Sequence, residues 1–207
     1  MSQAINKKNE YRKNLAEIFI KSLEEQEQKI DMIYTGFVGS EEQMDIIADF
    51  VNRSNAYILV DPVMGDHGKA YSTYTKEMCE KMKSLVAHSD ITTPNLTEAC
   101  ILSDTEYKES FTDNELIAIS KKVCSLGTKV CVITGIVRDN NIDTFVYKND
   151  GTYFINENER TEIMYAGTGD IFASVLCGKL ASGECLEKSI ATACDFVSKT
   201  TKYTMEL

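Results

Sequence analysis

Two glycines, a threonine and an aspartate stand directly before an apolar segment in the stretch YAGTGDIFAS, residues 165–174. A helix N-terminus offers unpaired backbone N–H groups and about half a positive charge, so it can hold an anion. Gly167 and Gly169 would let a phosphoryl group approach the backbone, and Thr168 would add a hydroxyl donor. Asp170 could take the proton of an attacking hydroxyl. The simpler alternative is a turn whose acid stabilises the helix dipole, but two glycines and an acid in one turn favour an anion site.

A second set of polar residues follows the apolar runs of the chain. The segments IYTG, LVDP, ITTPN and VITG each stop at a polar or glycine-containing cluster. The carboxyl ends of parallel strands share one edge of a sheet, which is where ligands bind. We therefore expect five residues to meet there: Asp61, Thr93, Asn95, Thr134 and Gly135. Pro62 and Pro94 also fall at these ends, and the simpler interpretation is that they only terminate strands.

Asn95 and Glu98 allow two interpretations. N-L-T-E has the pattern of a capping box, in which Asn95 caps a helix and Glu98 reaches back to its N–H. Alternatively, Glu98 faces the ligand edge and holds a cation directly or through water, because Mg²⁺ needs only one or two carboxylates beside substrate phosphates. One residue can do both, so both stay open. His67 and His88 belong to no visible catalytic or metal set, and we expect His67 to be an exposed loop residue.

Composition limits the class of protein. The 207 residues are 43% apolar with a net charge of −10, which suits one domain over 1–207 and disfavours nucleic acid or an anionic membrane as partner. No stretch approaches the roughly 18 apolar residues of a membrane span. Seven cysteines without a C-x-x-C pair indicate reduced thiols and a cytoplasmic location.

The segments that must position these residues alternate between the apolar spacing of helices and the continuous apolar runs of buried strands. Helical spacing predicts helices over 9–28, 41–54, 76–89, 96–103, 113–127, from the opening motif to about Leu180, and over 184–201. Apolar runs predict strands over 29–36, 56–62, 90–95 and 129–135, and a hairpin over 143–155 that turns at Asp150-Gly151. Strand–helix alternation followed by a hairpin predicts an α/β sandwich with a mainly parallel sheet and an antiparallel addition.

In this order, five segments resemble the pyridoxal kinase family of the ribokinase-like superfamily: YTGFVGS (34–40), VDPVMGDHGKAY (60–71), ITTPNLTEA (91–99), VITG (132–135) and AGTGDIFAS (166–174). With their spacing they cover most of the chain from about residue 11 onward. DPVMGD, TPN-x-x-EA and GTGD in succession are specific, whereas each alone would be weak. The resemblance implies a three-layer ribokinase-like fold and ATP-dependent phosphorylation of the 5′-hydroxymethyl group of pyridoxal, pyridoxine or pyridoxamine.

The resemblance also implies roles for phosphate-site residues. Asp170 corresponds to the base that contacts the hydroxymethyl oxygen, and residues 167–169 correspond to the anion hole. Asp61 and Glu98 resemble the acids that organise Mg²⁺ and the ATP phosphates, with Asn95 beside them. The aspartate at 170 also resembles pyridoxal kinases more than hydroxymethylpyrimidine kinases, which commonly carry cysteine in this position.

Further roles follow from the same resemblance. Thr134 and Tyr71 match nucleotide-contacting positions, and Gly36 and Phe37 fall where the family lines the acceptor pocket. The family further implies a homodimer and a monovalent cation such as K⁺.

One departure from the family concerns the first part of the chain. Family members normally have some 70 or more residues before the segment that matches YTG, and these form central strands and much of the vitamin pocket. Here about 30 residues precede Ile33, and they predict one helix. We therefore expect a fragment, a shortened gene model or a diverged member, with unpaired strand edges and exposed apolar surface. The alternative functions are a non-catalytic nucleotide-binding or assembly protein and a hydroxymethylpyrimidine or sugar kinase.

Overall fold

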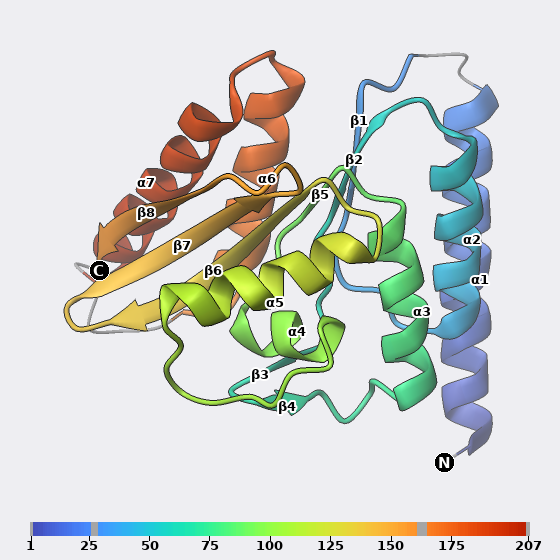
Figure 1. Ribbon diagram of the computed structural model, residues 1–207. Coiled ribbons are helices and arrows are strands. Elements are labelled where there is room, and N and C mark those ends of the chain that lie inside the picture. The colour runs from blue at the N-terminus through green and yellow to red at the C-terminus, as the bar shows by residue number, and fades with distance from the viewer. Residues whose placement is uncertain (1, 26–28, 161–164, 206–207) are drawn as a thin grey trace.

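The computed structural model describes residues 2–25, 29–160 and 165–205 (Figure 1). Its centre is a six-stranded sheet with the order β1-β2-β5-β6-β7-β8. Four strands are parallel: β1 (Met32–Thr35), β2 (Tyr57–Val60), β5 (Ile91–Thr92) and β6 (Val130–Arg138). The last two, β7 (Asn141–Lys148) and β8 (Tyr153–Glu159), are antiparallel. The predicted mainly parallel sheet with an added hairpin is thereby confirmed.

Helices cover both faces of the sheet (Figure 1). One face carries α6 (Thr168–Ala181) and α7 (Leu186–Met205). The other carries α2 (Glu41–Arg53), α3 (Lys76–Ala87), α4 (Leu96–Leu102) and α5 (Asp113–Ser125). The first helix, α1 (Ser2–Glu25), packs mainly on α2. Among the described residues, no helix is both long and apolar enough to span a bilayer.

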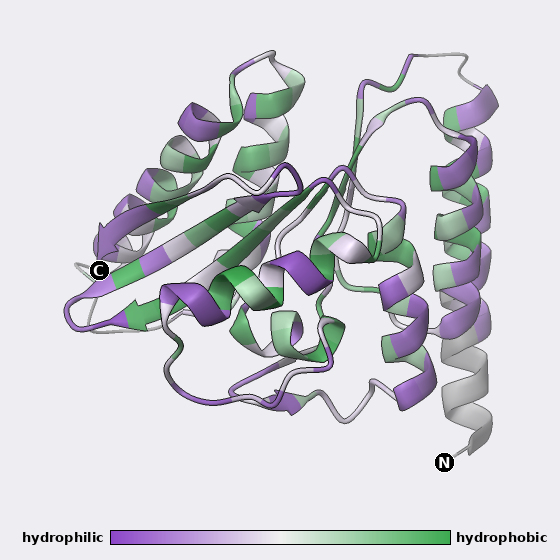
Figure 2. Ribbon diagram, in the orientation of Figure 1, coloured by the Kyte–Doolittle hydropathy of each residue, from purple (hydrophilic) through white to green (hydrophobic). Residues whose placement is uncertain are grey.

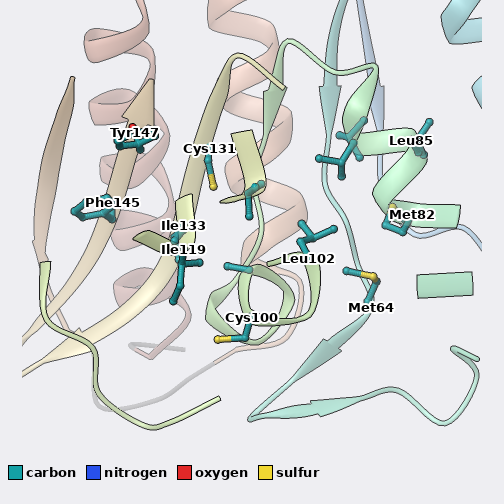
Figure 3. Close-up of a cluster of buried hydrophobic side chains, with 14 of the residues drawn as sticks. Met64, Met82, Leu85, Cys100, Leu102, Ile119, Cys131, Ile133, Phe145 and Tyr147 are labelled. Carbon is teal, nitrogen blue, oxygen red and sulfur yellow. The ribbon is translucent and has the colours of Figure 1, made fainter. Parts of the chain in front are cut away.

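The apolar strand runs are explained by burial on both faces. In β2, Ile58 and Val60 belong to the larger core under α2–α5, whereas Leu59 belongs to the smaller core under α6 and α7. The larger core is shown in Figure 3, where side chains from several helices meet those of the sheet. Figure 2 shows that the central strands are strongly hydrophobic, while polar residues gather on β8 and the outer faces of helices. Each fully buried aliphatic side chain stabilises the fold by roughly 1.5–3 kcal/mol.

Two local features differ from the expected elements. Gly135 was expected to end a strand, but β6 continues to Arg138 through a register shift between Ile133 and Ile136. Gly135 has φ +73°, which glycine adopts without strain, so the strand bends there rather than stops. A two-stranded ribbon of β3 (Gly65–Asp66) and β4 (Lys69–Ala70) was not predicted. His67 lies in its turn, exposed as expected.

Candidate functional site

Asp61 is a buried acid at the end of β2. Its side chain belongs to a residue only 6% exposed, and its backbone N–H donates to the Thr35 carbonyl of β1 at 2.8 Å. Burial and, to a smaller extent, the negative charge of Asp170 together raise the pKa of Asp61 to about 7, whereas the nearby Thr93 hydroxyl opposes the shift. Thr93 Oγ1, buried beside this carboxyl at the end of β5, makes no well-formed hydrogen bond within the described part of the chain. A buried acid beside an unsatisfied hydroxyl oxygen is a donor set that suits a hard cation such as Mg²⁺.

The capping box at the start of α4 is present, and it also holds a loop. Asn95 Oδ1 accepts from the N–H of Glu98 at 3.0 Å, and Glu98 Oε2 accepts from the N–H of Asn95 at 2.8 Å. Glu98 Oε1 accepts from the N–H of Met64 at 3.1 Å, while Asn95 Nδ2 donates to the Gly65 carbonyl at 2.8 Å. The pair thus fixes the β2–β3 loop to α4. Because both Glu98 oxygens already accept backbone hydrogen bonds, its metal role stays a prediction.

Electrostatics links Glu98 to the rest of the site. The pKa of Glu98 is raised to about 8, mainly by burial and to a smaller extent by the charge of Asp61, while backbone N–H donors oppose the shift. Tyr71, 42% exposed, donates its N–H to the Met64 carbonyl at 2.8 Å. Burial raises the pKa of the Tyr71 phenol, and the charges of Asp66, Glu98 and Asp61 raise it too. Tyr71 therefore borders the same acidic group.

The N-terminus of α6 is open. Gly167 lies at φ +85° in the N-cap position, and no side chain caps the helix within the described residues. A Cβ placed on Gly167 or Gly169 would meet no atom within 4 Å. Thr168 Oγ1 donates to the Tyr165 carbonyl at 3.4 Å. Among the described residues, neither glycine is crowded and no side chain caps the first turn, as an anion cradle requires.

Asp170 lies in the first turn of α6, where Tyr34 of β1 contacts it. The Tyr34 hydroxyl donates to Asp170 Oδ1 across 3.4 Å. A Cβ on Gly36 would lie 3.2 Å from that hydroxyl and 3.8 Å from Asp170 Oδ1, so Gly36 also borders this point. Phe37 is 49% exposed, and its ring packs edge-on against Tyr74 with centroids 6.1 Å apart. Sequence reasoning missed Tyr34; its signal was its place directly before the Thr-Gly that ends β1.

A cavity of about 150 Å³ opens beside the α6 N-terminus. Thr134, Gly135, Thr168 and Gly169 line it, whereas Asp61 and Glu98 do not. The other lining residues come from β6–β8 and from the segments around α6 and α7: Val137, Ile142, Thr144, Asn158, Glu159, Arg160, Tyr165, Phe172, Cys194, Val197, Ser198 and Thr201. These were missed, although the alternation of β7 already placed Ile142 and Thr144 on one face.

The separate segments converge on one region. Asp170 acts electrostatically on Asp61, and Asp61 acts on Glu98. Asn95 forms an isolated parallel bridge with Thr134, whose N–H donates to the Pro94 carbonyl at 2.9 Å. Thr134 in turn shares the cavity with the α6 N-terminus. An uncapped helix N-terminus beside a cavity, with Asp170 in its first turn and the buried Asp61 in electrostatic contact with it, is an arrangement suited to phosphoryl transfer, which relies on positioning and electrostatic stabilisation.

Comparison with known proteins finds a kinase family model and similar kinases. The family model described as phosphomethylpyrimidine kinase matches residues 6–207. The Haemophilus influenzae hydroxymethylpyrimidine/phosphomethylpyrimidine kinase is 27% identical over 169 residues, which are 79% of this chain and 62% of the relative. A Bacteroides thetaiotaomicron protein assigned as a phosphomethylpyrimidine kinase matches with a TM-score of 0.86 and 32% identity, over 91% of this chain and 67% of its own. A second crystal form of it contains pyridoxal.

Leishmania donovani pyridoxal kinase in complex with ADP and pyridoxamine matches with a TM-score of 0.75 and 26% identity. That match covers 85% of this chain and 62% of the kinase. The chain therefore spans between 62% and 67% of the length of these three proteins. The similar proteins divide between kinases of vitamin B6 forms and kinases of thiamine precursors.

Proposed function

This chain belongs to the phosphomethylpyrimidine kinase family, and we propose that it transfers the γ-phosphoryl group of ATP to a hydroxymethyl group on an aromatic ring. The acceptor that we propose is pyridoxal, pyridoxine or pyridoxamine, which would be converted to its 5′-phosphate. The observation that carries the proposal is the uncapped, glycine-lined N-terminus of α6, with Asp170 in its first turn.

In the proposed reaction, the acceptor hydroxyl oxygen forms a bond to the γ-phosphorus while the bond from that phosphorus to ADP breaks. Asp170 receives the hydroxyl proton, and Tyr34 orients the Asp170 carboxylate through its hydrogen bond. The N–H groups of residues 168–170 stabilise the negative charge of the transferred group. A bound Mg²⁺, held beside Asp61, would supply neutralising charge for the ATP phosphates. Glu98 and Asn95 hold the neighbouring loop in place.

The cavity is the proposed place of the nucleoside part of ATP. It is continuous with the anion cradle, because Thr168 and Gly169 line it. Its walls include apolar side chains that can contact a base, and Asn158 and Arg160 add polar groups to the lining. The phosphates would then run along the α6 N-terminus toward Asp61 and Asp170. Gly36, where a Cβ would lie 3.8 Å from Asp170 Oδ1, and Phe37, which follows it in the chain, would border the proposed acceptor position.

Four observations bear on the choice of acceptor. The aspartate at 170 and the pyridoxal-containing crystal form of the Bacteroides protein support a vitamin B6 form. The family model and the Haemophilus relative support hydroxymethylpyrimidine as the competing acceptor. A panel of both acceptors with one enzyme preparation decides between them, since the ratio of their kcat/KM values measures the preference. Replacing K⁺ by Na⁺ in the same assay tests the expected monovalent-cation dependence.

The test of the kinase proposal is ATP-dependent formation of pyridoxal 5′-phosphate by the purified chain, with Asp170→Asn as its partner variant. Loss of the base is expected to lower the rate by about 10²- to 10⁴-fold while ATP affinity is kept. Turnover that survives the substitution contradicts the role of Asp170. Calorimetry with Mg-ATP and then with the vitamin covers the remaining alternative, because nucleotide binding without vitamin binding indicates a non-catalytic protein.

A further inference from the structure

The two strands β6 and β7, which wall the cavity on one side, have a second face that is turned away from it. Val137, Ile142 and Thr144 line the cavity. The other face packs against α5, which lies across both strands (Figure 1). Since successive side chains of a strand point to opposite faces, the chain neighbours of these three residues lie behind the cavity wall. Two of those neighbours are charged, Arg138 and Asp143.

Arg138 reaches this face because of the register shift between Ile133 and Ile136. Both isoleucines face the larger core, although one is odd-numbered and the other even-numbered. The shift thus turns the even-numbered residues in the last part of β6 toward α5. Arg138 Nη2 donates to Oδ1 of Asp113, the first residue of α5, at 2.6 Å. The guanidinium therefore ties the end of β6 to the start of this helix.

Asp143, on β7, is the second carboxylate that Arg138 contacts. It is 3% exposed, its Oδ2 lies 3.5 Å from Arg138 Nε, and its Oδ1 has no hydrogen-bond partner within the described residues. Burial raises the pKa of Asp143, and the Arg138 guanidinium opposes that shift. The charges of Glu157 and Asp113 add to it. Without the guanidinium, the Asp143 carboxylate would be a buried charge beside like charges, which is strongly destabilising. The position of β7 at Asp143 therefore depends on Arg138.

We propose that Arg138 is a positioning residue for the nucleotide: by joining α5 to β6 and β7, it holds the cavity wall in the shape that accepts the nucleoside. This inference rests on the proposed function, because it takes the cavity as the nucleoside site. Arg138 does not line the cavity itself, so it acts through Val137, Ile142 and Thr144. Arginine suits this role because its planar fork can bind two carboxylates at once, whereas lysine offers a point charge.

Steady-state kinetics of Arg138→Met test this role. KM for ATP should rise at least about fivefold with kcat near its wild-type value, because a wall that binds the nucleoside acts equally on the ground state and the transition state. A merely structural role would lower the fraction of folded enzyme and leave KM for ATP unchanged. Arg138→Lys should recover part of the lost affinity. Arg138→Met/Asp143→Asn should recover most of it, because no buried charge is then left unpaired.

The matched control is Lys81→Met, at a contact between α2 and α3. Lys81 also contacts two acids, Asp45 and Glu41, and its side chain is 34% exposed, against 32% for Arg138. The control should keep the wild-type KM for ATP, because neither α2 nor α3 lines the cavity.

Amide hydrogen exchange examines the cavity wall without any nucleotide. In Arg138→Met, the N–H groups of residues 141–144 should exchange at least about fivefold faster than in the wild type, since β7 then opens locally. Residues 57–60 of β2 should exchange at wild-type rates. Unchanged exchange over 141–144, an equal rise over 57–60, or a wild-type KM for ATP in Arg138→Met overturns the inference. A wild-type chain that binds no ATP contradicts the proposed function instead, and faster exchange over 141–144 would still support Arg138 as the residue that holds the wall.

Discussion

The Tyr34 hydroxyl, on the edge strand β1, donates a hydrogen bond to Oδ1 of Asp170 in α6, 136 residues further along the chain. Burial raises the pKa of Tyr34 above its usual range, and the charges of Asp61 and Asp170 raise it further. The phenol therefore remains a donor at neutral pH. Gly36 leaves room for it, since a Cβ there would lie 3.2 Å from the hydroxyl. The orientation of the proposed base thus depends on β1.

Tyr34→Phe removes this donor and keeps the ring. We expect kcat to fall by about 2- to 10-fold, because a hydrogen bond contributes roughly 0.5–1.5 kcal/mol, while KM for ATP stays unchanged. Steady-state kinetics measure both constants. Tyr153→Phe, which removes an exposed hydroxyl on β8, is the control and should change neither. A Tyr34→Phe enzyme with wild-type kcat contradicts the positioning role.

Gly169→Ala separates the anion cradle from helix stability. A Cβ at Gly169 meets no protein atom within 4 Å, and alanine favours helix by up to about 1 kcal/mol, so the free energy of unfolding should stay equal or rise. The methyl group would occupy the cradle, and kcat/KM for ATP should fall by at least about tenfold. Gly178→Ala, equally uncrowded in the same helix, should raise stability alone. Full activity in Gly169→Ala would contradict the proposed role of Gly169 in the anion cradle.

Asp61→Asn should change how stability depends on pH. The folded chain holds the pKa of Asp61 at about 7, above its ordinary value of 3.8, so between these values the folded state binds more protons than the unfolded state. The free energy of unfolding therefore falls as pH rises through this window, by an amount on the order of a few kcal/mol.

Asparagine cannot titrate, so urea unfolding should show the variant gaining stability over the wild type from pH 4 to pH 8. Asp195→Asn, on the exposed surface of α7, is the control and should follow the wild-type curve. The same Asp61→Asn variant should bind Mg-ATP more weakly. If the free energies of unfolding of Asp61→Asn and the wild type changed in parallel with pH, Asp61 would not have a raised pKa in the folded chain.

Ser198→Phe fills the cavity from α7. If the cavity holds the nucleoside, KM for ATP should rise at least about tenfold, since an aromatic ring then competes for the same volume. Ala191→Phe, on an exposed position of the same helix, should leave KM unchanged. Unaltered ATP affinity in Ser198→Phe would place the nucleoside elsewhere.

The alternating elements could be predicted from the sequence because the central runs in β2, β5 and the first part of β6 are buried on both faces, while helices such as α2 and α3 have one apolar face. The capping box of Asn95 and Glu98 was also visible, because its spacing is local. The continuation of β6 beyond Gly135 was missed, since glycine at φ +73° bends a strand that long-range pairing with β7 then extends. The β3–β4 ribbon was missed because two-residue strands leave no periodic signal.

Candidate site residues could be predicted from the sequence where they lie within a local motif. Residues that reach the same region from other elements, through tertiary packing, could not. Asp61 follows the end of β2 and Gly167–Asp170 mark the start of α6, both of which sequence patterns reveal, and Thr134 directly precedes the bend of β6 at Gly135. Cys194 and Asn158 reach the cavity only through the packing of α7 and β8. Tyr34 meets Asp170 through the packing of β1 on α6. Such contacts depend on tertiary arrangement, which no local pattern records.

Cys194 gives the cavity wall a chemical reporter. Its thiol is buried beside Thr144 Oγ1 at 3.4 Å, and burial raises its pKa, so freely diffusing alkylating reagents should modify it slowly. A mild electrophile attached to a cavity-binding scaffold would label this cysteine because binding holds it there. Mass spectrometry of the single peptide that contains Cys194 could then read occupancy of the cavity in an unpurified extract.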